Sequence, residues 1–240
     1  MGLVGLVGND VVDLADAAIH DHHLRVGFID RVLAPSEHGM LDRATDRKVF
    51  LWSLFAAKEA AFKVTQKLRG ATVFAHRRFV VAADLRSVRY DDLLLPLALK
   101  QESGFVHAVV GVNCPHARSA VEQISAAADQ SRAVRSLCRR LTSGVLGCVP
   151  SELEIVREST PWTYSGHGPP LLRLRGKDVG VDISLSHDGR FVAVVAGFPP
   201  SMQLLQGTRT NCVGFRANCV GSHGNTVIAG KSSLARQLLA

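Results

Sequence analysis

Several common signatures of function are absent from the sequence. None of the cysteines forms a CxxC pair, and their odd number, five, argues against a complete disulfide framework. A reducing cytoplasm is therefore the expected compartment. No apolar run approaches ~18 uninterrupted residues, so no membrane span is expected. The cysteines are Cys114, Cys138, Cys148, Cys212 and Cys219.

The apolar start of the chain, MGLVGLVGNDVVDL, also lacks the marks of a targeting segment. It has no basic residue ahead of the apolar run, Asp10 interrupts it, and Leu6 stands where a myristoylation signal has Ser or Thr. We expect a mostly buried strand over residues 3–14, because branched apolar residues dominate that stretch.

What is present is the composition of a folded protein with a basic surplus. Hydrophobic residues make up 47% of the 240 residues and charged residues 20%. The net charge of +7 favours acidic partners such as nucleic acid, a phosphorylated cofactor or an acidic protein. Nucleic acid has the least support, because the sequence contains no recognised binding motif and no aromatic stacking platform.

Hydrophobic periodicity predicts an α+β protein. We expect helices over residues 16–32, 35–45, 46–68 and 131–147, an antiparallel meander over 79–85, 93–99 and 105–112, and a hairpin over 181–198. The helix over 46–68 has the strongest signal, because good helix formers dominate it and Gly70 supplies a stop. Small and polar residues predict a linker over 114–130.

Two carboxylates stand in apolar surroundings. In WSLFAAKEAAFK, Glu59 and Lys63 lie one helical turn apart, and such a pair is usually a surface ion pair. Trp52 and Phe55 on nearby turns favour partial desolvation of this pair. Asp10 lies within a predicted apolar strand. The alternative interpretation is that this aspartate ends the strand or belongs to a turn. If Asp10 meets Glu59, their oxygens suit Mg²⁺, which commonly takes one or two carboxylates.

Further polar residues lie near the two predicted strands. Asp13 and Asp16 are expected in a solvated turn. In SLSHDG, Ser186 and His187 lie beside a tight turn. A strand-end histidine is usually structural or exposed, but a hydroxyl and an imidazole also suit phosphate oxygens. No G-x-S-x-G elbow surrounds these serines, so an acyl-enzyme mechanism has little support.

Three segments taken together resemble the 4′-phosphopantetheinyl transferase superfamily. They are GNDVVDL at 8–14, WSLFAAKEAAFK at 52–63 and ISLSHDGRFVAVVAGF at 183–198. Members of this family move the phosphopantetheine arm of coenzyme A onto a serine of an apo acyl or peptidyl carrier protein. They release adenosine 3′,5′-bisphosphate and use magnesium. The resemblance covers most of residues 5–198.

The resemblance implies roles for the residues of the first two segments. Asp10 and Glu59 would hold Mg²⁺, and Lys63 would contact the phosphates of coenzyme A. Glu59, or a water held by the metal, would help deprotonate the carrier serine, so Glu59 and Lys63 are the expected catalytic residues. Val12 stands where the larger family type often has an acid, so two protein carboxylates plus water are expected at the metal.

The resemblance also implies cofactor contacts from the later part of the chain. Ser186 and His187 are expected at the adenosine phosphates. Gly168-Pro169-Pro170 is similar to a G-x-P loop that precedes the hairpin in the larger type. Arg132 and Arg135 are weaker candidates for contacts with phosphate or with the carrier.

The implied architecture is a pseudo-dimeric fold of two α+β halves, with antiparallel sheets packed on long helices. The half with the GND and KEAAFK motifs is expected at 1–115, the half with GPP and SLSHDG at 116–200, and a flexible tail at 201–240. This order is that of the small holo-acyl-carrier-protein synthase type, whereas the length and second half resemble the surfactin-synthetase-activating type. One chain that carries both halves predicts a monomer.

Two functions follow from the resemblance. The first is an active transferase for carrier proteins of fatty-acid, polyketide or nonribosomal-peptide synthesis, whose acidic surfaces suit a basic enzyme. The alternative is a non-catalytic protein with the same fold that binds coenzyme A or a nucleotide. The joint presence of Asp10, Glu59, Lys63 and His187 favours the transferase.

Overall fold

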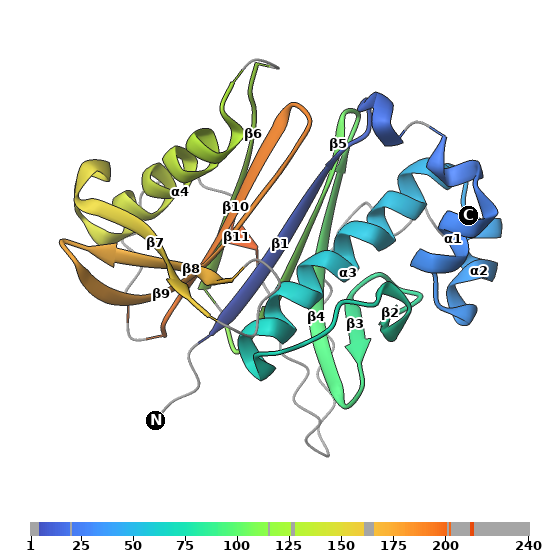
Figure 1. Ribbon diagram of the computed structural model, residues 1–240, viewed down its shortest axis with the longest axis horizontal. Helices are drawn as coiled ribbons and strands as arrows, with labels where there is room; N and C mark the ends of the chain where they lie inside the picture. Colours follow the sequence, from blue (N-terminus) through green and yellow to red (C-terminus); the bar gives the residue numbers. More distant parts are fainter. Residues whose placement is uncertain are drawn as a thin grey trace, which may run out of the picture.

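The computed structural model describes residues 5–19, 21–114, 116–125, 128–160, 166–200, 202 and 212–213 (Figure 1). Its strands form two antiparallel sheets, of five strands in the order β1-β5-β4-β3-β2 and six in the order β11-β6-β10-β9-β8-β7. The first sheet comprises β1 (Leu6–Asp13), β2 (Phe79–Val81), β3 (Ser87–Tyr90), β4 (Leu93–Glu102) and β5 (Phe105–Val112). The second comprises β6 (His116–Gln123), β7 (Leu153–Ser159), β8 (His167–Leu174), β9 (Lys177–Asp188), β10 (Phe191–Phe198) and β11 (Cys212–Val213).

Helices pack on both sheets, which confirms the predicted α+β class and its pseudo-dimeric layout. They are α1 (Val26–Val32), α2 (Pro35–Asp42), α3 (Arg47–Arg69) and α4 (Gln130–Leu146). Four short 3₁₀ turns accompany them: η1 (Ala17–Ile19), η2 (His22–Leu24), η3 (His76–Arg78) and η4 (Pro150–Glu152). In Figure 1, α3 lies along the first sheet and α4 lies against the second.

Helix α3 confirms the strongest helix prediction, and its ends have clear causes. The Asp46 side chain accepts a hydrogen bond from the Val49 amide at 2.9 Å, which caps the first turn. Gly70 ends the helix with a positive φ of 70°, a conformation that costs glycine little. The helix packs very closely on β1 at Gly8, where an added Cβ would lie 2.2 Å from the Ala60 carbonyl oxygen. Glycine at this position therefore brings the strand and helix that carry Asp10 and Glu59 together.

Helix α4 covers the second sheet with a stripe of apolar residues. Its stripe consists of Val134, Leu137, Cys138, Leu141 and Val145, all buried against strands of that sheet. Asp129 caps its start by accepting from the Arg132 amide at 3.0 Å, and Gly147 ends it in the left-handed region.

The two sheets meet where β1, an edge strand of the first, lies beside β9 of the second. Every second backbone N–H of β1 points away from β5 and donates to a β9 side chain. The four pairs are Val7 to Asp182, Asn9 to Ser184, Val11 to Ser186 and Asp13 to Asp188, at 2.7 to 3.2 Å. Because unpaired edge amides are costly when buried, these side chains fix how the two sheets sit together.

Some sequence-based assignments were wrong. Residues 16–32 do not form one helix, because Arg25 is extended (φ −88°, ψ 106°) and separates η2 from α1. Residues 116–123, within the predicted linker, form β6. Its small residues Ala117 and Ser119 are buried, and Ala117 packs with Val7 of β1. The 79–85 strand is limited to β2, and β3 was not predicted.

The remaining architectural predictions have mixed outcomes. The hairpin over 181–198 is confirmed as β9 and β10, which turn at Gly189 and Arg190. Of the predicted tail, residues 212–213 form β11 against β6, and apart from residue 202 the rest lies outside the described residues. The division at residue 115 stays a prediction. No helix in the described ranges has the length and apolar run that a membrane crossing needs.

Candidate functional site

Asp10, Lys63 and Ser186 meet at the junction of the two sheets. Lys63, on α3, places its Nζ 3.0 Å from Asp10 Oδ1 and 2.7 Å from the Asn9 carbonyl oxygen. Ser186, on β9, donates to the same Oδ1 at 2.8 Å while its Oγ accepts from the Val11 amide. Asp10 is therefore held by a helix and by a strand of the other sheet.

The electrostatics around Asp10 favour a cation. Burial raises the pKa of Asp10, Lys63 lowers it, and the nearby Glu59 carboxylate raises it again. Glu59 is thus close enough for its charge to act on Asp10. Two partly buried carboxylates that repel each other are the donor set that a hard divalent ion stabilises. Asp10 and Glu59 side chains are 13% and 24% exposed, so an ion between them would be largely shielded from solvent.

The residues present therefore fit a magnesium ion. Within the described ranges, no group of three or more His, Cys, Asp or Glu side chains is arranged for a metal. The magnesium hypothesis accordingly rests on Asp10 and Glu59, one from β1 and one from α3.

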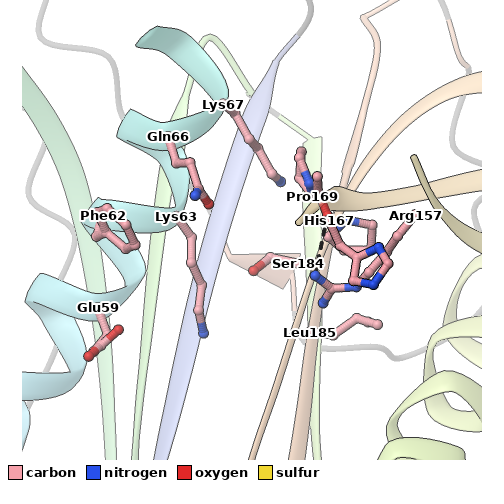
Figure 2. Close-up of a pocket in the computed structure, with 12 residues that line it drawn as sticks. Glu59, Phe62, Lys63, Gln66, Lys67, Arg157, His167, Pro169, Ser184 and Leu185 are labelled. Carbon is pink, nitrogen blue, oxygen red and sulfur yellow. Dashed lines mark hydrogen bonds between the residues drawn. The ribbon is translucent and has the colours of Figure 1, made fainter. Parts of the chain in front are cut away.

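A cavity of about 190 Å³ opens beside this pair (Figure 2). Its walls come from α3, from β7 and β8, and from β9, and Figure 2 shows Lys63 and Lys67 opposite Arg157 and His167. Glu59 is the one acidic residue among the described lining. The lining consists of Glu59, Phe62, Lys63, Gln66, Lys67, Arg157, His167, Gly168, Pro169, Pro170, Ser184 and Leu185. This arrangement suits a ligand with several negative charges.

The basic residues that line the cavity differ in the hydrogen bonds and ion pairs that they make within the protein. Lys67 is 6% exposed, and its Nζ contacts both Asp182 oxygens and the Val7 and Ile183 carbonyls, so it joins the two sheets. Arg157 donates to the Gly168 carbonyl oxygen at 3.3 Å. Its partial burial and the nearby Arg135 lower the pKa of Arg157. A phosphate beside Arg157 would relieve this repulsion between two guanidinium groups.

The predicted site residues do not all reach the cavity. Glu59 and Lys63 line it, and Asp10 lies against Lys63. Ser186 is buried and faces Asp10 rather than the cavity lining. His187, the next residue along β9, is exposed and lies on the opposite face of the strand, because side chains alternate along a strand.

The two predicted arginines of α4 also lie away from the lining. Arg132 is exposed, whereas Arg135 donates to the Ile155 carbonyl oxygen at 3.0 Å and acts on the cavity through its charge beside Arg157. Phosphate contacts from these two residues stay predictions.

Asp13 is not in a solvated turn, so that prediction was wrong. Its side chain is 2% exposed, and both oxygens accept from the Arg190 guanidinium in the β9–β10 turn. These bonds lower the pKa of Asp13 to about 2. The pair closes the end of the β1–β9 junction.

Three residues near the site were missed by the sequence reasoning. Arg157 comes from a segment without a recognisable motif, His167 directly precedes Gly168-Pro169-Pro170, and His76 is the first residue of η3. His76 places its Nε2 3.7 Å from Glu59 Oε1. Strand alternation could have found one feature, since it puts Ser184 and Ser186 on one face and His187 on the other.

Residues 6–91 match the family model described as the 4′-phosphopantetheinyl transferase superfamily. This stretch is a domain of that superfamily. The matched residues include Asp10, Glu59 and Lys63, which the structure brings together. No curated protein matches the chain. The phosphopantetheinyl transferase domain thus supplies β1 and α3, while Ser186, Arg157 and His167 come from residues beyond the match.

Acid should destabilise the protein through His107, which lies on β5 beside Asn9 of β1. His107 is 3% exposed, its Nε2 is 3.2 Å from the Asn9 side-chain nitrogen, and burial lowers its pKa to about 3. An unfolded histidine has a pKa of about 6.5, so between these values the unfolded chain binds a proton that the folded chain does not. The free energy of unfolding should fall by about 1 to 2 kcal/mol between pH 7.5 and pH 5.

Urea unfolding of wild type and His107→Gln at the two pH values checks this effect. The variant should lack this part of the loss, because glutamine does not titrate. The contribution of Asp13 to the free energy of unfolding changes in a different pH range. It is present above about pH 4 and is lost only as the pH falls toward the folded pKa of Asp13, about 2. An equal acid loss in both proteins would contradict the role of His107.

Proposed function

We propose that the protein transfers the 4′-phosphopantetheine moiety of coenzyme A to a serine of an apo acyl or peptidyl carrier protein. The products are holo carrier protein and adenosine 3′,5′-bisphosphate. The single observation that carries the proposal is the cavity with basic residues on two walls that opens beside the Asp10–Glu59 pair.

The cavity supports binding of the phosphate-bearing part of coenzyme A. At about 190 Å³ it is smaller than the several hundred Å³ of a typical pocket for a whole ligand. Lys63 on one wall and Arg157 on the other supply charge to the diphosphate from two directions. Pro169 and Pro170 hold one wall stiffly, because proline fixes φ.

Asp10 and Glu59 are the residues that would hold magnesium. The ion, when bound, neutralises charge on the diphosphate. Ser186 supports this role by donating to Asp10 Oδ1. The oxygen of Asp10 that would bind the ion is then Oδ2. Lys63 bridges the two parts of the site, since it contacts Asp10 and also lines the cavity.

The reaction itself is a displacement at phosphorus. Glu59 takes the proton of the carrier serine, and the serine oxygen forms a bond to the phosphorus that bears the pantetheine arm. The bond from that phosphorus to the bridging diphosphate oxygen breaks, and adenosine 3′,5′-bisphosphate leaves with the electron pair. Lys63 offsets the charge that develops on the departing group.

The carrier and the oligomeric state follow from the same reasoning. A net charge of +7 suits the acidic surface that carriers usually present. Because α3 meets β7, β8 and β9 of the same chain at the cavity, a single chain provides both walls, and we propose a monomer.

The alternative is a non-catalytic protein that binds coenzyme A or a nucleotide in the same cavity. Chromatography of reactions that contain the protein, coenzyme A, magnesium and apo carrier separates the two. A transferase releases adenosine 3′,5′-bisphosphate only when the carrier is present. A binding protein retains coenzyme A by equilibrium dialysis and releases no product with any carrier tested.

A further inference from the structure

The side chain that faces Glu59 from outside the cavity is His76, in the segment that follows α3. Its Nε2 lies 3.7 Å from Glu59 Oε1. The same Nε2 is buried and has no hydrogen-bond partner among the described residues. A buried ring nitrogen without a partner is uncommon, and Glu59 is the carboxylate that it faces.

Aromatic packing fixes the direction of this imidazole. The His76 ring packs at a tilt against Phe55 and Phe74, with ring centroids 4.9 Å and 4.2 Å away. Phe55 precedes Glu59 by one turn of α3, and Phe74 packs in turn on Phe62, a lining residue of the cavity. The imidazole is therefore packed between two aromatic rings next to the wall of the cavity, with its Nε2 on the side of Glu59 Oε1.

The two carboxylates of the site have different kinds of support. Asp10 is held by Lys63 and by Ser186 through hydrogen bonds. For Glu59, His76 is the basic side chain within 4.0 Å in the described part of the chain. A small rotation of the Glu59 side chain closes the 3.7 Å separation to a hydrogen bond, and such bonds often tighten only when a site is loaded.

We propose that His76 is a positioning residue for Glu59. Its Nε2–H binds Oε1, selects one rotamer of the carboxylate and leaves Oε2 as the oxygen that faces a divalent ion. This inference rests on the proposed function, because it assigns the role of His76 through Glu59 as a metal ligand. Partners of this kind orient metal-binding side chains, and their removal typically costs about 10- to 100-fold in metal affinity or activity.

The test compares two substitutions in the full-length chain, His76→Phe and His76→Gln. Phenylalanine keeps the ring between Phe55 and Phe74 but removes the nitrogen, whereas glutamine keeps an N–H donor but removes the ring. Mn²⁺, as a probe for Mg²⁺, is titrated into each protein and the free ion is followed by electron paramagnetic resonance. Thermal unfolding and the kcat and KM of transfer are measured on the same samples.

We expect His76→Phe to weaken Mn²⁺ binding by about 10- to 100-fold and to lower kcat with little change in the melting temperature. His76→Gln should retain Mn²⁺ affinity within a few-fold, even if it melts earlier. Wild-type affinity in His76→Phe would overturn the inference, as would an equal loss in both variants, which would indicate a packing role alone.

Failure of the proposed function has a different outcome. If wild type neither binds Mn²⁺ nor transfers phosphopantetheine, and Asp10→Asn changes nothing, the site is not a metal site and the inference falls with it. If wild type binds and Asp10→Asn abolishes binding while His76→Phe does not weaken it, only the role of His76 is overturned.

Discussion

Glu59→Gln is expected to lower the rate of phosphopantetheine transfer by roughly 10³-fold, equivalent to about 4 kcal/mol of transition-state stabilisation. Glutamine keeps the shape of the side chain but loses the charge that holds a cation and the oxygen that accepts the serine proton. Because Glu59 is 24% exposed and its basic neighbour His76 lies 3.7 Å away, the melting temperature should change little. Single-turnover transfer with saturating coenzyme A measures the chemical step.

A matched control removes the same charge elsewhere. Glu154→Gln changes an exposed side chain of β7 outside the described cavity lining, and it should transfer at the wild-type rate. Undiminished transfer by Glu59→Gln would remove this carboxylate from the mechanism. A loss that is accompanied by unfolding of the variant would be assigned to stability, so circular dichroism accompanies the kinetics.

Lys58→Met is expected to cost about 3 to 5 kcal/mol in the free energy of unfolding. Lys58 and Glu37 are both 0% exposed and lie 2.5 Å apart, and Lys58 also donates to the Val32 carbonyl oxygen. Removing the ammonium leaves the Glu37 carboxylate buried without its cation. Burial lowers the pKa of Lys58, and the Glu37 carboxylate that faces it opposes this shift.

Urea unfolding measures this loss of unfolding free energy. Two further variants serve as a control and as a test of the pairing. Lys100→Met, on the surface of β4, should change the free energy of unfolding by about 0.5 kcal/mol or less. Glu37→Gln combined with Lys58→Met should cost less than the two single changes together, because neither buried charge is then left alone. A cost below about 1 kcal/mol for Lys58→Met would contradict a buried ion pair that organises this part of the domain.

The Lys58–Glu37 pair could be predicted from the sequence only in part. Lys58 falls in a stripe of α3 at helical spacing with Leu51, Leu54, Ala61 and Thr65, all of them buried. The spacing could therefore have flagged a buried lysine. Its partner Glu37 comes from α2, and no pattern within either segment pairs the two. Glu37 also accepts from the Ala34 and Val81 amides, so it ties α2 and β2 to α3.

The two carboxylates of the site were predictable, because each breaks an apolar pattern of its own element. Asp10 interrupts a strand and Glu59 interrupts an apolar helix, and the motif resemblance joined them. The basic wall opposite was not predictable in this way. Arg157 and His167 lie on exposed parts of β7 and β8, where an arginine or histidine carries no local signal.

The junction between the two sheets was predictable only in part. Asp182, Ser184, Ser186 and Asp188 alternate along β9, which does predict four polar side chains on one face. What they bind depends on β1 lying beside them, and that contact joins residues about 175 positions apart. Alternation along the sequence predicts which side chains of β9 share a face, whereas the tertiary packing decides that β1 is the strand they bind.

Phosphopantetheine transfer is tested most directly by the intact mass of an apo carrier protein after incubation with this protein, coenzyme A and magnesium. We expect the carrier serine to gain one phosphopantetheine group, and this gain should disappear with a metal chelator, with Glu59→Gln and with a carrier whose acceptor serine is alanine. The contradicting result is coenzyme A bound to the protein while carriers of fatty-acid, polyketide and nonribosomal-peptide synthesis all keep their apo mass.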